Sequence, residues 1–332
     1  MRGVNPAPLR LVVMGTGPFA VPMFEALRGT PHTIAAVVTR PDRAPAGRRP
    51  PPNPMREAAV AARLPILDPE RINDPEATAA VAALRPDLLV VCDYGQILAP
   101  AALAAAPLGG INLHGSLLPR HRGAAPVQWT ILEGDVLAGV SVIHMTPALD
   151  AGNVILARAT PVAPRETAAE LEVRLAELGA GAVVEAIERL QAAVAAGLPS
   201  TAVGTPQEQD KATRAPRLAK SDGLVDWSWP AARIERLRRA LEPWPRATTF
   251  FTRADGVRQR LVLADVEVVT AGEIRAGATP GTVTSTTNDR VVVACGDGTA
   301  LAILRLVPEG RREMSAAEFL RGSPLAVGAR LG

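Results

Sequence analysis

Three side chains near the middle of the sequence, Asn112, His114 and Asp150, are of the types needed to stabilise an oxyanion and handle a proton. Asn112 and His114 stand two residues apart in an apolar run, and on a strand this spacing places both side chains on one face. The amide can donate hydrogen bonds, and the carboxylate can favour a charged imidazolium. A histidine at a strand end is often structural, and Asp150 could form an Asx turn. The residues alone therefore leave both interpretations open.

The segment that follows His114 reads as an irregular loop. Gly115 gives the backbone conformational freedom and Pro119 stiffens the exit of the loop. Ser116 lacks the Gly-x-Ser-x-Gly setting of a hydrolase nucleophile, so we predict that its hydroxyl only fixes the loop. His32, His121 and His144 show no metal-ligand spacing with His114 or with either cysteine, which argues against a zinc site.

Alternating elements in the first half of the chain must position these side chains. Continuous apolar runs read as strands, separated by helical patterns, and this order predicts a parallel sheet covered on both faces, a Rossmann-like α/β domain. Ligand sites in such sheets lie at the strand ends, where Gly15, Tyr94, Asn112 and His114 stand. The expected strands are residues 11–14, 34–39, 65–66, 88–91, 111–114 and 139–145, and the expected helices are residues 21–27, 55–62 and 75–84.

The pattern changes after residue 197. A capping box at Thr167–Glu170 opens a long helix that runs to about Ala195, and residues 198–217 read as a basic linker. Beyond it come an amphipathic helix over Pro230–Leu241 and short strands separated by turns, which indicate a small barrel. We therefore expect a catalytic domain over residues 1–197 and a second domain over residues 218–332. The expected short strands are residues 247–252, 261–269, 281–285, 291–295 and 300–306.

The composition fits a globular protein with two cores. The chain has 332 residues, of which 48% are hydrophobic, and a formal net charge of +3. Aromatic residues make up only 3%, which argues against a long base-stacking surface. Cys92 and Cys295 lie in apolar runs and read as buried thiols in a reducing compartment. No apolar run approaches the ~20 residues of a membrane span, and the first residues lack a signal-peptide core, so we expect a cytoplasmic protein.

Several motifs together carry a resemblance. Asn-x-His-Gly-Ser-Leu-Leu-Pro from Asn112, Arg-Gly-Ala-Ala-Pro from Arg122 and Leu-Asp-x-Gly from Leu149 resemble the methionyl-tRNA formyltransferases, a branch of the folate-dependent formyltransferase family. The resemblance implies formyl transfer from N10-formyltetrahydrofolate to the α-amine of methionyl-initiator-tRNA, without a metal or redox cofactor. It implies catalytic roles for Asn112, His114 and Asp150, and an OB-like barrel as the second domain. We further expect the chain to act as a monomer.

The same resemblance implies two binding surfaces. The folate donor should contact Ser116, Leu117, Leu118 and Pro119, against walls that include Tyr94, Gly95 and Ile97. The tRNA should be contacted by a basic, proline-rich loop and by the linker. Arg48 and Arg49 replace the usual Gly-Lys-Lys of that loop, and Arg214-Ala-Pro-Arg replaces Tyr-Ala-Pro-Lys of the linker. The expected tRNA-binding residues are Arg40, Arg43, Arg48, Arg49, Lys211, Arg214 and Arg217.

Three alternatives compete with this interpretation. The first is an NADP oxidoreductase, because Gly15-x-Gly17-x-x-Ala20 loosely matches a dinucleotide-binding fingerprint. NADP is favoured over NAD because Arg40 stands where NAD-binding proteins have an acidic residue. A sugar-amine formyltransferase with the same site is the nearest rival. A non-enzymatic RNA-binding module would rest on the basic segments alone.

Overall fold

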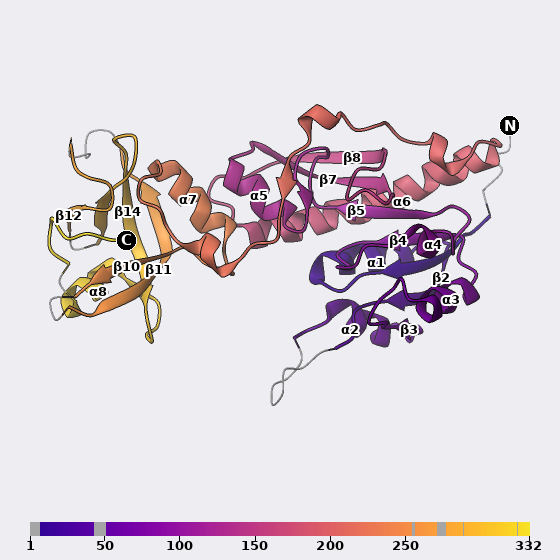
Figure 1. Ribbon diagram of the computed structural model, residues 1–332, viewed down its shortest axis with the longest axis horizontal. Coiled ribbons are helices and arrows are strands. Elements are labelled where there is room, and N and C mark those ends of the chain that lie inside the picture. Colours follow the sequence, from indigo (N-terminus) through magenta and orange to yellow (C-terminus); the bar gives the residue numbers. More distant parts are fainter. Residues whose placement is uncertain (1–6, 43–50, 254–255, 271–276, 288, 324) are drawn as a thin grey trace. The chain divides into compact units, whose positions relative to one another are not determined.

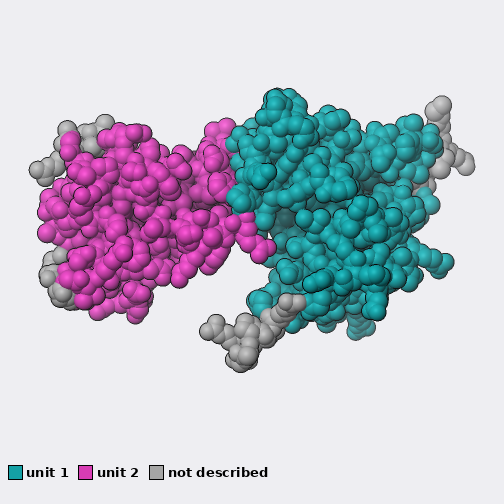
Figure 2. All heavy atoms as spheres, in the orientation of Figure 1, with its two compact units in different colours: residues 1–127, 137–161, 170–216 teal, residues 128–136, 162–169, 217–332 magenta. Residues whose placement is uncertain are grey.

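The computed structural model describes residues 7–42, 51–253, 256–270, 277–287, 289–323 and 325–332. The chain divides into two compact units (Figure 2). The first unit comprises residues 1–127, 137–161 and 170–216, and the second comprises residues 128–136, 162–169 and 217–332. Residues 198–216, which read as a linker in the sequence, therefore pack with the first unit. No helix in the described ranges is both long and apolar enough to cross a membrane.

The elements expected in the first half of the chain form where the sequence predicts them, to within a few residues (Figure 1). Helix α4, helix α5 and strand β8 were not predicted. The elements up to residue 216 are β1 (Arg10–Met14), η1 (Pro18–Ala20), α1 (Val21–Arg28), β2 (Thr33–Val38), α2 (Pro54–Ala61), β3 (Ile66–Leu67), α3 (Pro75–Ala83), β4 (Leu88–Val91), α4 (Pro100–Leu103), β5 (Gly110–His114), β6 (Arg122–Gly123), α5 (Pro126–Glu133), β7 (Leu137–His144), β8 (Val154–Pro161), α6 (Ala168–Ala195), η2 (Ser200–Ala202), η3 (Gln209–Lys211) and β9 (Arg214–Ala215).

The main sheet of the first unit has the strand order β3-β2-β1-β4-β5-β7-β8. Strands β1 to β5 pair in parallel, which confirms the Rossmann-like prediction, whereas β7 and β8 run antiparallel to their neighbours. Strand β8 escaped prediction because it is an edge strand. Its apolar residues 154–157 are followed by Arg158, and residues 157–159 are exposed, so it lacks the fully buried run of the interior strands.

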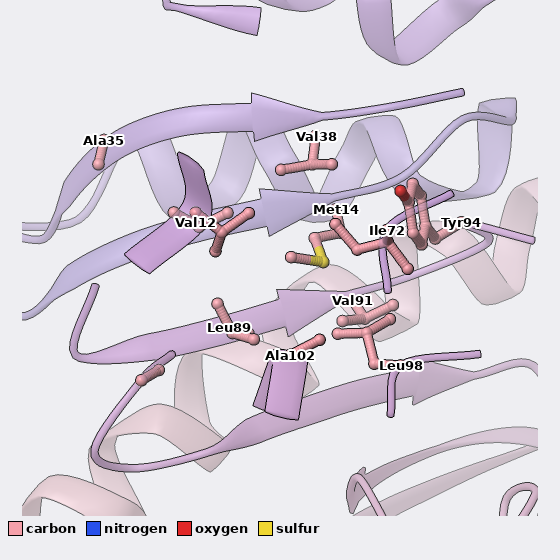
Figure 3. Close-up of a cluster of buried hydrophobic side chains, with 12 residues drawn as sticks. Val12, Met14, Ala35, Val38, Ile72, Leu89, Val91, Tyr94, Leu98 and Ala102 are labelled. Carbon is pink, nitrogen blue, oxygen red and sulfur yellow. The ribbon is translucent and has the colours of Figure 1, made fainter. Parts of the chain in front are cut away.

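One face of this sheet packs against α3 and α4 through a cluster of buried apolar side chains (Figure 3). Val12 and Met14 of β1 and Leu89 and Val91 of β4 belong to the cluster, and these alternate positions share one face of the sheet. The intervening residues of each strand are buried on the other face, as expected for a sheet covered on both sides.

Helix α6 fixes the strand that carries the catalytic candidates. A Cβ atom on Gly179 of α6 would stand 2.7 Å from Cδ2 of Leu113, so the helix lies directly against β5 at this point. Because side chains alternate along a strand, Asn112 and His114 leave β5 on the face opposite Leu113. The tight packing of Leu113 under α6 thus holds the two polar side chains in register.

The second unit contains the barrel that the sequence predicts. Its sheet has the order β10-β11-β14-β13-β12, with β15 paired to β14. Leu331 donates its N–H to Gly281 and Gly332 donates to Phe250, so the last residues of the chain join both edges of the sheet and close it. The elements are η4 (Lys220–Gly223), α7 (Ala231–Ala240), β10 (Thr248–Thr252), β11 (Arg258–Val268), β12 (Val283–Thr286), β13 (Val291–Ala294), β14 (Ala300–Pro308), β15 (Met314–Ser315) and α8 (Ala316–Gly322).

Both cysteines are buried free thiols, Cys92 just after β4 and Cys295 just after β13. Burial raises the pKa of the Cys92 thiol well above its ordinary value and raises the pKa of Cys295 to about 12. We expect iodoacetamide at pH 8 to alkylate the native chain ~10³-fold more slowly than the unfolded chain, because the reactive thiolate is suppressed. Mass spectrometry of quenched time points measures both rates. Fast labelling of either cysteine in the native state would contradict this expectation.

Candidate active site

Asn112 and His114 stand at the carboxyl end of β5, between β4 and β7. Asn112 is half-buried, and its side-chain amide makes no hydrogen bond to any residue that the structure describes. The amide is therefore free to donate to a bound ligand. His114 is buried, with 5% of its surface exposed, and lies opposite Ser141 of β7 in the antiparallel register.

The hydrogen bonds of His114 decide which ring nitrogen is open to chemistry. Nε2 lies 2.9 Å from the backbone carbonyl oxygen of His121, which can only accept, so Nε2 carries a hydrogen and donates it. In the neutral ring Nδ1 then bears the lone pair. Nδ1 lies 3.7 Å from Oδ2 of Asp150, close enough for an ion pair with the charged ring and too long for a direct hydrogen bond. Nδ1 is therefore the nitrogen that can exchange a proton with a substrate or with a bridging water.

Asp150 stands in a sharp turn between β7 and β8. Its backbone has the left-handed φ of 50°, and its Oδ2 accepts a hydrogen bond of 2.9 Å from the N–H of Gly123. Two residues later, a Cβ atom on Gly152 would overlap the carbonyl oxygen of His144. The Leu-Asp-x-Gly pattern is thus explained locally, because only glycine allows the turn to pack so closely against the end of β7.

The loop after His114 is fixed by hydroxyl groups. Ser116 donates through Oγ to the carbonyl of Arg120 at 2.6 Å, which confirms the loop-fixing role predicted from the sequence. Ser141 of β7 donates to the carbonyl of Ser116 at 2.8 Å and accepts from the N–H of Leu118 at 3.1 Å. His121, with a left-handed φ of 62°, donates its N–H to Oγ1 of Thr213 at 2.9 Å. These bonds hold the His121 carbonyl where His114 needs an acceptor.

The predicted donor-contacting residues fall into two groups. Ser116 is buried while Leu117, Leu118 and Pro119 are half-buried, so this loop presents mainly apolar atoms near the trio. Tyr94, in contrast, is only 2% exposed and packs inside the cluster of Figure 3. Burial raises its pKa to about 12, and its hydroxyl finds no hydrogen-bond partner among the described residues. Its neighbours Gly95 and Ile97 are exposed.

The structure describes some of the predicted tRNA-binding residues. Arg43, Arg48 and Arg49 lie outside the described residues, and Arg40 is exposed beside Gly95. Lys211 forms an exposed ion pair of 2.6 Å with Glu208. The exposed side chains of Arg214 and Arg217 make no hydrogen bond or ion pair to another described residue, which leaves their charges available to an anionic partner.

Residues that sequence reasoning missed lie in the segment after α6. Gln207 and Thr213 contact the loop and the turn that carry the trio, and Arg122 joins them by hydrogen bonds to Gln207 and Gln209. Arg122 belongs to the Arg-Gly-Ala-Ala-Pro motif, but Gln207 stands in a polar stretch without periodicity. These pairs are more than 50 residues apart in sequence, so local patterns could not connect them.

The glycine-rich turn after β1 does not favour a dinucleotide. Gly15 is crowded by Ala20 and by the carbonyl of Cys92, which makes it a packing glycine. At Gly17 a Cβ atom would overlap the carboxylate of Asp93. A pyrophosphate at this turn would therefore meet a negative charge, which disfavours the NADP interpretation. In the described part of the chain there is also no group of three or more His, Cys, Asp or Glu side chains suited to a metal ion.

Two family profiles match this chain, one in its N-terminal part and one in its C-terminal part. The profile of the family described as formyl transferase matches residues 9–187, and the profile described as formyl transferase, C-terminal domain, matches residues 217–324. The chain belongs to the formyl transferase family. This membership confirms the family resemblance seen in the motifs around Asn112, His114 and Asp150.

Curated relatives in this family align along nearly the whole chain. The methionyl-tRNA formyltransferase of Rhodopirellula baltica is 47% identical over 328 residues, covering 97% of this chain and 96% of the relative. The methionyl-tRNA formyltransferase of Solibacter usitatus is 40% identical over 326 residues, covering 98% and 99%.

Solved formyltransferase structures share the fold. The N-formyltransferase from Helicobacter canadensis, in complex with folinic acid and dTDP-3-aminofucose, superposes with a TM-score of 0.62 at 13% identity, covering 89% of this chain and 99% of that one. HypX from Aquifex aeolicus, in complex with tetrahydrofolic acid, gives a TM-score of 0.60 at 17% identity over 98% of this chain and 51% of that one. At sequence identities this low, the structural similarity supports a shared fold and nothing more.

Proposed function

We propose that this chain transfers the formyl group of N10-formyltetrahydrofolate to the α-amine of methionyl-initiator-tRNA. The observation that carries the proposal is the juxtaposition of the unpaired Asn112 amide with the His114–Asp150 pair at the carboxyl end of β5. The full-length identity to methionyl-tRNA formyltransferases supports the acceptor. The amide, the imidazole and the carboxylate can together stabilise the oxyanion of acyl transfer to an amine and handle its protons.

The mechanism follows from what each group can donate. The neutral methionyl amine attacks the formyl carbon, and a tetrahedral oxyanion forms. The Asn112 amide and the protonated Nδ1 of His114 donate to this developing charge, while Asp150 stabilises the imidazolium. The attacking nitrogen then loses a proton and N10 gains one as the C–N10 bond breaks, so the reaction is balanced without a base of unusual strength. A free α-amine has a pKa of ~8, and esterification of the methionine carboxyl to the tRNA lowers this pKa further, so the neutral nucleophile is available near neutral pH.

The test is an assay of formyl transfer by the full chain. Methionyl-initiator-tRNA and methionyl-elongator-tRNA are offered with the folate donor, and formyl-methionine is counted after hydrolysis of the ester. We expect transfer to the initiator, with a lower kcat/KM for the elongator. Transfer to an amino sugar nucleotide but to neither tRNA would replace this proposal by the sugar-amine alternative. Binding of NADP without binding of folate would overturn the reaction class.

Arg214 and Arg217 provide a prediction about the tRNA. The Arg214→Ala, Arg217→Ala double variant should raise the KM for tRNA while the KM for the folate donor stays unchanged, because both free guanidiniums are proposed to contact phosphates. The slope of log affinity against log salt should shrink by up to ~2. Kinetics at two salt concentrations measure both effects. An unchanged salt slope would show that this part of the chain does not contact the RNA.

The basic loop around Arg43 is proposed to read the acceptor end. Initiator and elongator carry the same amino acid, so the choice between them needs contacts to the RNA itself. The planar guanidinium group of arginine suits phosphates and base edges, and one short stretch contains Arg40, Arg43, Arg48 and Arg49.

We further propose that the chain is a monomer and that it acts in the cytoplasm, where initiator tRNA is used. Light scattering of the purified chain tests whether it is a monomer.

A further inference from the structure

Gln207 is a buried polar side chain, 9% exposed, in the segment that follows α6. Its side-chain oxygen accepts hydrogen bonds from Nε and Nη2 of Arg122, at 3.1 and 2.6 Å. Its side-chain nitrogen donates to the backbone carbonyls of Asp150 and Gly152, at 2.8 and 2.7 Å. One amide thus joins β6 to the turn that carries the catalytic carboxylate.

The chemistry of the partners fixes the orientation of this amide. A guanidinium only donates, so it must face the oxygen of Gln207, and backbone carbonyls only accept, so they must face the nitrogen. Both hydrogens and both lone-pair directions of the amide are then used. Glutamate could keep the bonds to Arg122, but it could not donate to Asp150 and Gly152. The position therefore calls for a side chain that donates and accepts at the same time.

The Asp150 turn depends on these contacts. Asp150 has a left-handed backbone, and the partner that the structure gives its carboxylate besides His114 is the N–H of Gly123, the residue after Arg122. Gln207 holds the backbone of the turn, and Gly123 holds its carboxylate. The distance between Asp150 and His114 is thus set by groups that all connect through Arg122 and Gln207.

The segment around Gln207 also supports His114. Residues 205–215, here called the strap, begin with paired backbone bonds of 2.9 Å between Thr205 and Val154. They continue to Thr213, which accepts from the N–H of His121, the residue whose carbonyl receives the Nε2 hydrogen of His114. The strap then ends in β9, whose Arg214–Ala215 pair in parallel with β6. One segment therefore touches the supports of both catalytic side chains.

We propose that Gln207 is a positioning residue of the active site, which sets the Asp150 carboxylate against Nδ1 of His114. This inference rests on the proposed formyl transfer. Without the two donated bonds, the carbonyls of Asp150 and Gly152 lose their anchor and the turn relaxes. A misplacement of ~1 Å at a reacting group can lower a rate by ~10²-fold, so the effect belongs to turnover rather than to donor binding.

Three variants of the full chain test the proposal. Gln207→Glu keeps the volume and the Arg122 contacts but removes both donated hydrogens. Gln207→Ala removes all of the bonds. Gln209→Ala is the matched control, because Gln209 lies on the same strap and also accepts from Arg122, at 2.9 Å, but is exposed and does not reach the turn. For each variant one measures kcat, the KM for the folate donor, the melting temperature, and the distance from Asp150 to His114 in a crystal structure.

We expect kcat to fall by about 10–100-fold in Gln207→Glu and Gln207→Ala, with the donor KM changed by less than about twofold. The Gln209→Ala control should keep kcat, and the crystal structure of Gln207→Glu should show the carboxylate displaced from Nδ1. Wild-type kcat in Gln207→Glu, an equal loss in Gln209→Ala, or a risen donor KM at unchanged kcat would each overturn the proposal. A wild-type chain that transfers no formyl group would instead refute the proposed function, and the displacement in the crystal structure would still report on Gln207.

Discussion

The His114→Ala variant is expected to lose about 10²–10³-fold in kcat while it still binds the folate donor, because His114 acts on charge that develops only in the transition state. Asn112→Ala should lose a similar factor through its missing amide donor. The structure supports this expectation, because the Asn112 amide has no described partner and Nδ1 of His114 is the ring nitrogen left open. Rapid-quench kinetics on charged tRNA measure kcat, and calorimetry measures donor affinity.

The Asp150→Asn variant separates the charge of Asp150 from its geometry. Asparagine can still accept from the N–H of Gly123 through its side-chain oxygen, so the turn should survive while the negative charge near Nδ1 is lost. We expect a severe loss of kcat for this variant too. His32→Ala is the matched histidine control, because His32 precedes β2 at the opposite end of the strands and accepts from the N–H of Leu9. Near-normal turnover in His114→Ala would refute the mechanism.

The Gly152→Ala variant is expected to lose about 10²-fold or more in kcat. A Cβ atom at this position would overlap the carbonyl oxygen of His144, and a backbone atom at the end of a strand that is paired on both sides cannot move aside cheaply. The turn must shift instead, and it carries Asp150. The Cβ atom would lie 1.8 Å from that oxygen, so the turn must move by more than about an ångström, and the catalytic geometry should suffer more than the binding of the donor.

A second glycine provides the control for Gly152. Gly181 lies in α6, and a Cβ atom there would meet nothing within 4 Å. Gly181→Ala should therefore keep kcat and raise the free energy of unfolding by about 0.5–1 kcal/mol, as alanine restricts the unfolded chain and suits a helix. Denaturant titration measures the free energy of unfolding of both variants, and enzyme kinetics measures their kcat. If Gly152→Ala retains wild-type kcat, the turn tolerates displacement and its assigned role is wrong.

The catalytic candidates were accessible from sequence because their signal is local. Asn112 and His114 occur two residues apart in an apolar run, so a strand of any register would place them on one face. The apolar runs of β1, β4 and β5 likewise indicate buried parallel strands, because a strand covered on both faces needs apolar residues at successive positions. Helix α6 and helix α7 were predictable from their 3.6-residue periodicity and, for α6, from the capping signal at Thr167.

The way these parts come together depends on the fold of the whole chain. Asp150 meets His114 because β7 runs antiparallel beside β5 and β8 runs antiparallel beside β7, and the short apolar run of edge strand β8, residues 154–157, does not by itself indicate this pairing. Tyr94 reads as a pocket wall in the sequence, yet it is buried among core side chains. Gln207 reads as part of a linker, yet its side chain joins the Asp150 turn to Arg122. It follows Asp150 by more than 50 residues and Arg122 by more than 80 residues in the sequence. Hydrophobic periodicity encodes the burial of an element, whereas a polar contact between distant segments depends on the path of the whole chain. For this reason local patterns indicate most of the elements, the family and the three catalytic candidates, whereas the path of the folded chain sets which nitrogen of His114 is open and which side chains hold Asp150 against it.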